Sequence, residues 1–388
     1  MILLVIVLGA AAWLLAKRST SSWESSTGHL PETVVRFPIN DVAQITIEQP
    51  TGQVNLNKKG DSWVVAEKSD YPADFEMVST FVREAWELKP VQELRVVGSS
   101  QLGKLSLLPP RKGTGGGTLA IFRSVQGKRL AAILFGKKYM RETTQSFAQG
   151  RPFPAGRYVT PETGLQRVFL VSAVLPQIDE RPEQWLDRSF IKIQKPVSVT
   201  VAGSSPGLNW TLERTAGAKN WKLVGATSSE QLDQAKTIQI VSALSSISSF
   251  VDVIAPNTKP ESIGLDRPTI ITIKTEDGST YILKIGNKMG ETYPLIFRME
   301  ANPTKIGALV KGEKSATGVK FERETKAKSN ILRQKLAQEQ SFKGRIFLVP
   351  QFGIERLKKN RADLLLTKTT PATSSSPSAG PPLQPHKS

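Results

Sequence analysis

Residues 167–171 read RVFLV and residues 345–349 read RIFLV. Three earlier landmarks precede both runs in the same order: Trp63 and Trp221, Leu107-x-x-Pro110 and Leu265-x-x-Pro268, and ILFG ending at Gly136 and LKIG ending at Gly286. Ordered landmarks repeated at a long spacing are typical of a duplicated unit. The sequence therefore predicts two tandem homologous units, over residues 36–190 and 191–366.

Each unit has the same succession of element signals. Short β-branched runs are followed by a Trp-bearing strand, and then by an amphipathic helix over about residues 73–88 or 229–248. A hairpin follows, turning near Gln126-Gly127 in the first unit and at Asp277-Gly278 in the second. The pattern predicts an α+β fold in which each unit is an antiparallel sheet with a covering helix.

Each unit also has an insertion that the other lacks. Residues 111–118 (RKGTGGGT) occur only in the first copy. A phosphate-binding loop would require a Gly-Lys-Ser/Thr ending and a following helix, whereas strand-like residues follow here. We therefore interpret the run as a flexible loop insertion that folding does not require. The second copy has a basic insertion near residues 299–342.

Residues 1–16 (MILLVIVLGAAAWLLA) are continuously apolar and are followed by Lys17 and Arg18. As a helix this segment spans roughly 24 Å, close to the hydrocarbon thickness of a bilayer. We expect one N-terminal transmembrane anchor over residues 1–18; a cleaved signal peptide and a buried core element are the alternatives. Residues 19–35 are expected to form a polar tether, and residues 367–388 a disordered tail.

The net charge of +18 is concentrated near the C-terminus, because residues 301–370 hold 16 Lys and Arg against 6 Asp and Glu. A helix is expected over about residues 321–340. We expect four cations of this helix to contact an acidic partner or anionic lipid. They are Lys326, Lys328, Arg333 and Lys335. A solvated helix resting on the second unit is the alternative. Nucleic acid is not an expected partner, because interleaved aromatic residues are missing.

The composition restricts the chemistry that the chain can perform. It contains no cysteine and only two histidines, His29 and His386, both in polar terminal stretches. Thiolate nucleophiles, thiolate metal sites and disulfides are thereby excluded, and a histidine relay is disfavoured. The carboxylates of 179–188 lie among arginines, as in a solvated turn or helix. We therefore expect no enzyme activity and assign no catalytic, cofactor-binding or metal-ligating residue.

The same landmarks resemble a bacterial family, the domain-of-unknown-function family 4340. The motifs that carry the resemblance over most of residues 40–300 are Trp63, Tyr71-Pro72-Ala73-Asp74, Leu107 with Pro110, Gly127 to Gly136, Tyr158-Val159 and RVFLV at 167–171. The resemblance implies an N-terminal anchor in the bacterial inner membrane and an extracytoplasmic body. It also implies genes that neighbour those of a gliding-type ABC transporter, and it supplies no catalytic residues.

Two functions from different classes follow. The first is a non-enzymatic, membrane-anchored interaction protein that is accessory to an ABC-type transporter. The second is an extracytoplasmic binding module for a cell-wall glycan or another polymer, which an exposed Trp or Tyr platform would favour. Lys17 and Arg18 would place the body in the cytoplasm by the positive-inside rule. We follow the orientation that the family implies, which is periplasmic or extracytoplasmic.

Overall fold

A computed structural model describes residues 30–96, 98–110, 114–141, 152–161, 167–179, 181–301, 327, 329–337 and 342–366. The chain divides into two compact units. One consists of Met1–Phe190 with Ser249–Lys259 and Gly344–Val349, and the other of Ile191–Ser248, Pro260–Lys343 and Pro350–Ser388. The expected anchor over residues 1–18, the tail over residues 367–388 and much of the basic insertion lie outside the described residues.

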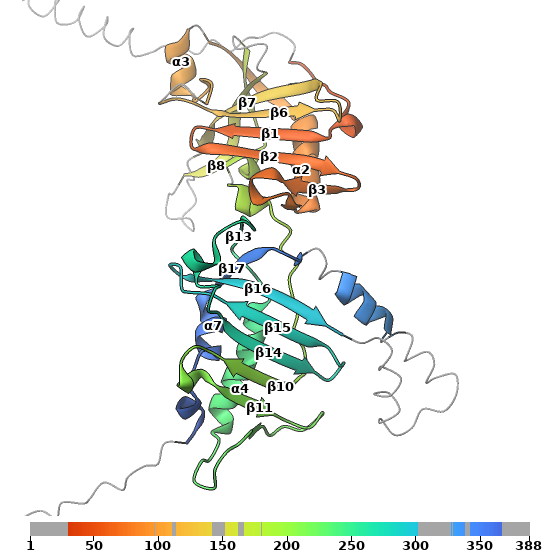
Figure 1. The fold of residues 1–388 in the computed structure, drawn as a ribbon. Helices are drawn as coiled ribbons and strands as arrows, with labels where there is room; N and C mark the ends of the chain where they lie inside the picture. The colour runs from red at the N-terminus through yellow and green to blue at the C-terminus, as the bar shows by residue number, and fades with distance from the viewer. Residues whose placement is uncertain are drawn as a thin grey trace, which may run out of the picture. The chain divides into compact units, whose positions relative to one another are not determined.

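The first unit is built on an antiparallel sheet with nine strands in its described part (Figure 1). Their order across the sheet is β4 (Tyr71–Pro72), β3 (Ser62–Val65), β2 (Gly52–Lys59), β1 (Gln44–Gln49), β6 (Thr118–Arg123), β7 (Arg129–Arg141), β8 (Phe153–Pro161), β9 (Arg167–Val171) and β5 (Pro90–Arg95). The β6–β7 hairpin turns at Gly127, whose φ is 78°, which confirms the turn predicted there.

Helix α2 (Phe75–Trp86) covers one face of this sheet, as expected. The Asp74 carboxylate caps the helix by accepting the backbone N–H of Met77 at 3.0 Å. The Phe81 ring packs 5.7 Å from the rings of both Phe122 and Trp185. A second apolar cluster covers the other face of β6 and β7; it contains Leu94, Leu105, Leu107, Leu119, Ile121, Leu134 and Val168. Central strands are thus buried on both faces, which explains their continuous apolar character.

A second antiparallel sheet has eight strands among the described residues. Their order is β12 (Lys222–Leu223), β11 (Trp210–Glu213), β10 (Pro196–Ala202), β14 (Thr269–Thr275), β15 (Thr280–Ile285), β16 (Thr292–Glu300), β17 (Ile346–Pro350) and β13 (Asp252–Ile254). The β14–β15 hairpin turns at Asp277-Gly278, with φ of 80° at Gly278, as predicted. Both sheets are antiparallel and the helices are few, so the expected α+β class is confirmed.

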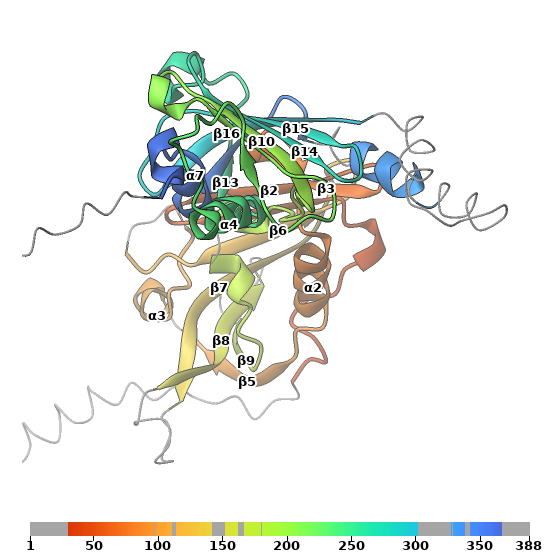
Figure 2. The ribbon, with the colours of Figure 1, turned by 90° about the horizontal axis from the view of Figure 1, so that it is seen from below.

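Helix α4 (Gln234–Ser242) begins later than the expected residue 229. The cause is a contact far along the chain, because Leu232 forms a bridge with Leu365 and the Asp233 carboxylate then caps the helix at Lys236 N. A 3₁₀ helix, Ala243–Ile247, continues α4 and contacts α7 (Gln351–Leu357). Figure 2 shows α4 and α7 from below.

The glycine-rich run of the first unit is a packed element in its described part. A Cβ atom at Gly117 would overlap the carbonyl oxygens of Ser106 and Phe135, and one at Gly115 would lie 2.9 Å from Gly103 Cα. The backbone of Leu108 forms two hydrogen bonds with this run. Its N–H donates to Gly115 O, and its carbonyl accepts from Gly117 N. The interpretation of the run as a flexible loop is therefore wrong for its described part: Gly115 and Gly117 let two backbones approach, and Thr118 begins β6. That folding does not require residues 111–118 stays a prediction.

The described residues include no helix that is long and apolar enough to cross a membrane. The apolar segment that led to the expected anchor ends at residue 16, before the first described residue.

Candidate functional site

The predicted basic contact is only partly within the described structure. Residues 329–337 are helical, as expected, whereas Lys326 and Lys328 lie outside the described residues. Arg333 is exposed, and Leu332 is buried. The Lys335 ammonium lies 2.6 Å from the Asp277 carboxylate at the β14–β15 turn. Lys335 therefore ties this helix to the second sheet, and Arg333 is the cation of the predicted set that faces solvent here.

The Lys335–Asp277 pair persists over a wide pH range. Burial alone would raise the pKa of Asp277, but hydrogen bonds from Lys335, Thr275 and Ser279 outweigh burial and bring the pKa to about 2. The carboxylate is thus ionised at any physiological pH. Half-exposed ion pairs stabilise a fold only modestly. We therefore interpret Lys335 as a residue that attaches this helix to the second sheet, and not as a cation that binds a partner.

A second group of residues gathers at one end of the first sheet. Pro90 of β5 pairs with Val171 of β9, Val171 pairs with Arg157 of β8, and Arg157 pairs with Lys138 of β7. These four residues form a row across the sheet. Val34, near the first described residue, donates its N–H to Leu88 O at 2.8 Å, just before β5 begins. The N-terminal segment therefore joins the fold at this end of the sheet.

Two strands continue past this row. The pairing of β6 with β7 ends at Phe135, whereas the pairing of β7 with β8 continues to Arg141 opposite Phe153. Lys138–Arg141 and Phe153–Gly156 therefore form a two-stranded ribbon that projects beyond the neighbouring strands (Figure 2). We call these two segments the ribbon, and this end of the sheet, with Trp86 to Pro90, the ribbon end.

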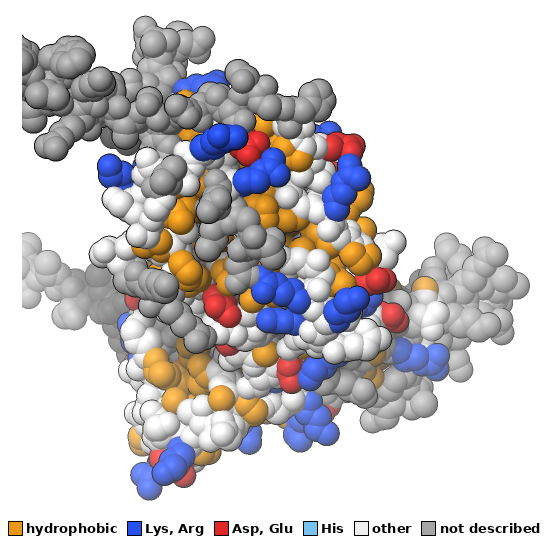
Figure 3. All heavy atoms as spheres, turned by 90° about the horizontal axis from the view of Figure 1, so that it is seen from above, with side chains coloured by type: hydrophobic (Ala, Val, Ile, Leu, Met, Phe, Trp, Pro, Cys, Tyr) orange, Lys and Arg blue, Asp and Glu red, His pale blue; other side chains and the backbone are white. Residues whose placement is uncertain are grey.

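The ribbon end exposes large apolar side chains. Met140 and Phe153 on the ribbon are each 47 % exposed, and Trp86 at the end of α2 is 41 % exposed. Exposed cations nearby are Lys89, Lys137, Lys138 and Arg141. Figure 3 shows hydrophobic side chains scattered among Lys and Arg on one face of the molecule. Exposed apolar patches that are rimmed by polar residues mark interaction sites.

An ion pair between a buried arginine and a half-exposed aspartate holds the base of the ribbon. The Arg157 side chain is almost fully buried, and its guanidinium donates to both Asp179 oxygens at 3.1 and 2.6 Å. Lys138 adds a contact to the same carboxylate at 2.9 Å. Burial raises the pKa of Asp179, but the hydrogen bonds from Arg157 and Lys138 outweigh it, so the pKa is lowered overall. The pair holds the base of the ribbon, while Met140 and Phe153 farther along it stay exposed.

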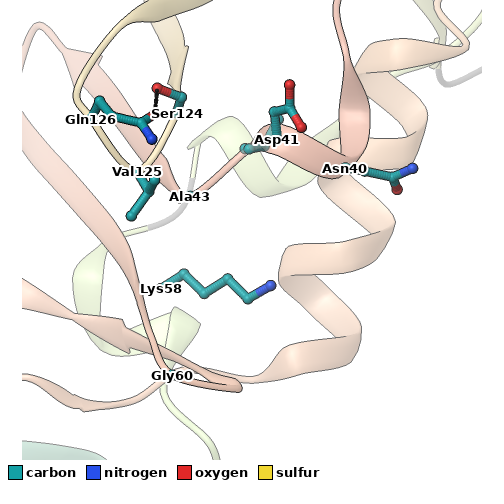
Figure 4. A pocket seen from close by; sticks show the side chains of 9 residues that line it. Asn40, Asp41, Ala43, Lys58, Gly60, Ser124, Val125 and Gln126 are labelled. Carbon is teal, nitrogen blue, oxygen red and sulfur yellow. Dashed lines mark hydrogen bonds between the residues drawn. The ribbon is translucent and has the colours of Figure 1, made fainter.

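An open hollow lies at the opposite end of the same strands (Figure 4). Its volume is about 520 Å³, and its lining includes Asp41, Lys58, Ser124 and Gln126. The Lys58 side chain extends across it, and the Ser124 hydroxyl donates to Gln126 Oε1 at 2.9 Å. These groups can hydrogen-bond a polar ligand. No nucleophile and base meet in hydrogen-bond contact among the residues drawn.

A larger open hollow of about 930 Å³ is lined by Trp86, Phe37 and the charged residues Glu32, Arg36, Glu87 and Lys89. Arg36 forms an ion pair with Glu32, and the Trp86 indole N–H donates to Phe37 O at 3.1 Å. The indole is thus held in place, with part of its surface open to solvent. A fixed, partly exposed indole is a platform on which a sugar ring could stack.

Sequence reasoning missed the ribbon end. Its signal is the basic and aromatic alternation on both sides of the hairpin, KKYMR at 137–141 and RPFP at 151–154. That pattern does not reveal that the two strands outrun their neighbours. Among the described residues, no group of three His, Cys, Asp or Glu could hold a metal ion.

Comparison with known proteins supports the resemblance drawn from the sequence. A family model described as a domain of unknown function (DUF4340) matches residues 63–268, from Trp63 in β3 to Pro268 just before β14. No curated protein and no solved structure matches the chain. Because the family model covers more than half of the sequence, the chain belongs to the DUF4340 family, a family of unknown function.

Proposed function

We propose that this chain is a non-enzymatic interaction protein of the bacterial inner membrane. In this proposal residues 1–18 are a single anchor, the body is extracytoplasmic, and the partner is a subunit of an ABC-type transporter. The body consists of two tandem homologous units, and no cofactor takes part.

The order of strands supports the duplication. Without the edge strand β4, the first sheet reads β3-β2-β1-β6-β7-β8-β9-β5, and the second reads β12-β11-β10-β14-β15-β16-β17-β13. Each strand has its counterpart at the same place in both orders. Trp63 lies on β3, and Trp221 directly precedes β12, which is the counterpart of β3.

Paired glycines add a detail that strand order alone does not require. A Cβ atom at Gly136 would overlap Leu105 O, and one at Gly286 would overlap Ile263 O. The residue after each glycine donates its N–H to that same carbonyl, at 2.9 Å from Lys137 and 2.8 Å from Asn287. Two unrelated units would have little reason to share this close backbone approach.

The observation that carries the membrane part of the proposal is the position of the ribbon end. The N-terminal segment joins the first unit beside Leu88, at the end of the sheet where Trp86, Met140 and Phe153 are exposed. A tether over residues 19–35 would reach roughly 20–25 Å as a flexible coil. A surface so close to an anchor would operate near the bilayer.

The test is purification of the intact chain from detergent-solubilised native membranes, with its partners identified by mass spectrometry. We expect transporter subunits to co-purify with it. Reversing the charges of Lys326, Lys328 and Arg333 should weaken the co-purification, and the co-purification should also be sensitive to salt. Lys335→Met is the matched control, because Lys335 is engaged with Asp277 and its loss should leave co-purification intact. Unchanged recovery after the triple reversal would remove this segment from the contact.

Orientation is tested separately by fusing alkaline phosphatase after Ser388. Enzyme activity of the fusion supports an extracytoplasmic body. Fluorescence of a reporter that folds only in the cytoplasm, placed at the same position, would contradict it.

A glycan-binding module is the second candidate, and the partly exposed indole of Trp86 favours it. In this function Trp86 would stack on a sugar ring while Arg36 and Lys89 bind its polar groups. Sedimentation of the intact chain with purified peptidoglycan tests it. Trp86→Ala should abolish the sedimentation, whereas Phe75→Ala, another exposed aromatic residue of α2, should not. Equal binding of both variants would reject the platform.

A further inference from the structure

We infer that the ribbon end of the first unit docks on an anionic phospholipid surface. The inference rests on the proposed membrane attachment, and it names the material that the ribbon end contacts. It concerns a surface far along the chain from the expected anchor and separate from the basic helix of the second unit.

Geometry places the ribbon and the N-terminal segment at the same end of the sheet. The row Pro90, Val171, Arg157 and Lys138 crosses four neighbouring strands, and three strand spacings amount to roughly 14 Å. The hydrogen bond from Val34 to Leu88 lies on the side of this row toward which the ribbon projects. A bilayer that holds the N-terminal segment would therefore lie on the side to which the ribbon points.

The side chains at this end match a headgroup layer. Met140 and Phe153 offer apolar surface, Trp86 is an aromatic residue of the kind enriched at membrane interfaces, and Lys137 and Arg141 are exposed cations. A peripheral surface that combines apolar side chains with Lys and Arg gains both burial and attraction to anionic lipid.

Nearby carboxylates do not cancel this charge. Glu32 is paired with Arg36, and Asp179 with both Lys138 and Arg157. Glu87, like Glu32, is an exposed carboxylate that lines the Trp86 hollow, which Arg36 and Lys89 also line. The ribbon in its described part carries Lys138 and Arg141 and no carboxylate.

The second unit shows that the fold does not require a ribbon. Its corresponding hairpin pairs Ile285 with Leu295 and encloses only residues 286–294, whereas Phe135 and Val159 enclose residues 136–158. An isolated two-stranded ribbon is only marginally stable in water. Retaining a ribbon that exposes Met140 and Phe153, in the unit that the N-terminal segment joins, is accounted for by a surface that covers these two side chains.

The experiment uses the full chain reconstituted into vesicles. Because the chain has no cysteine, Phe153→Cys gives a single labelling position for an environment-sensitive fluorophore. Val125→Cys is the matched control, since Val125 is 69 % exposed at the β6–β7 turn, at the opposite end of the same strands. Lipids that carry a quencher near the headgroup should quench the label at position 153 and not at position 125, in vesicles that contain phosphatidylglycerol.

Charge reversal provides a second test of the docking. Lys137→Glu with Arg141→Glu should lower the ratio of docked to undocked protein by at least about 30-fold, which is the effect of losing two cations alone, and high salt should lower it in the unaltered chain. If the vesicles retain the protein but the labels at positions 153 and 125 are quenched equally, or neither is quenched, the docking is overturned. The membrane anchor is not affected by that result. Release of the protein from vesicles by alkaline carbonate would instead overturn the anchor, and the inference with it.

Discussion

The ion pair at the base of the ribbon yields the sharpest stability prediction. Asp179→Asn removes a charge and leaves the Arg157 guanidinium in place, where its side chain is only 3 % exposed. The Arg157 Nε atom already lacks a hydrogen-bond partner. An uncompensated buried charge costs about 3–5 kcal/mol. Because the Asp179 side chain is 41 % exposed and asparagine can still accept one hydrogen bond, we expect a loss of about 3 kcal/mol, at the lower end of that range.

Thermal unfolding of the full chain in detergent, followed by circular dichroism, measures this effect. A unit of this size loses about 2–4 °C of Tm per kcal/mol, so the expected decrease is roughly 6–12 °C. The double variant Arg157→Met with Asp179→Asn removes both charges and should be more stable than Asp179→Asn alone. A cost of less than about 1 kcal/mol for Asp179→Asn, or a double variant that is less stable than Asp179→Asn, would mean that no uncompensated buried charge is created.

The pH dependence of the same pair has a definite sign. The pKa of Asp179 is lower in the folded chain than in the unfolded chain, so its contribution is present above the unfolded pKa of about 3.9. That contribution is lost as the pH falls through the lowered folded pKa. The difference in Tm between the native chain and Asp179→Asn should therefore be constant above about pH 5 and shrink below about pH 4. A difference that persists unchanged to low pH would mean that the charge is not its cause.

Two further predictions concern the glycines and the basic helix. Gly136→Ala and Gly286→Ala should each lower Tm by several degrees and by similar amounts. Gly52→Ala should have little effect in the same melting assay, because the space around its Cβ is open. Unequal losses of Tm at Gly136 and Gly286 would argue against the duplication. Lys335→Met should raise the pKa of Asp277 from about 2 toward the ordinary carboxyl range, read by titration of the Asp277 carboxyl carbon in NMR spectra; an unmoved pKa would show that Thr275 and Ser279 suffice.

Local signals in the sequence predicted local structure. The amphipathic pattern over about residues 73–88 predicted α2, and Asp74 caps that helix. Asp277-Gly278 between β-branched runs predicted the β14–β15 hairpin. These succeed because the determining interactions span only a few residues. Helix α4 was misjudged at its start, since the bridge of Leu232 to Leu365 depends on a residue far along the chain.

The features that sequence reasoning missed depend on non-local packing. The glycine run looked flexible because its need for small residues comes from the Ser106 and Phe135 carbonyls, which approach only in the folded sheet. Asp179 looked like a member of a solvated charged stretch, yet it pairs with the buried guanidinium of Arg157, a residue that the sequence analysis did not single out. No pattern in a single sequence states how far one hairpin extends beyond its neighbours, so the ribbon end could not be predicted.

The two hairpins suggest one decisive exchange. Replacing residues 136–158 by residues 286–294 would give the first unit the short connection of the second, because Phe135–Val159 and Ile285–Leu295 occupy corresponding places in the two strand orders. The exchange removes Arg157 and leaves Asp179 half-exposed, so no buried charge remains unpaired and we expect the hybrid to fold with a modest loss of Tm. A fluorophore at Lys89→Cys, which lies at the ribbon end but outside the exchanged segment, should then lose its quenching by headgroup-labelled lipid. A hybrid that cannot fold would contradict the correspondence of the two hairpins. A folded hybrid whose label is still quenched would show that residues other than the ribbon make the lipid contact.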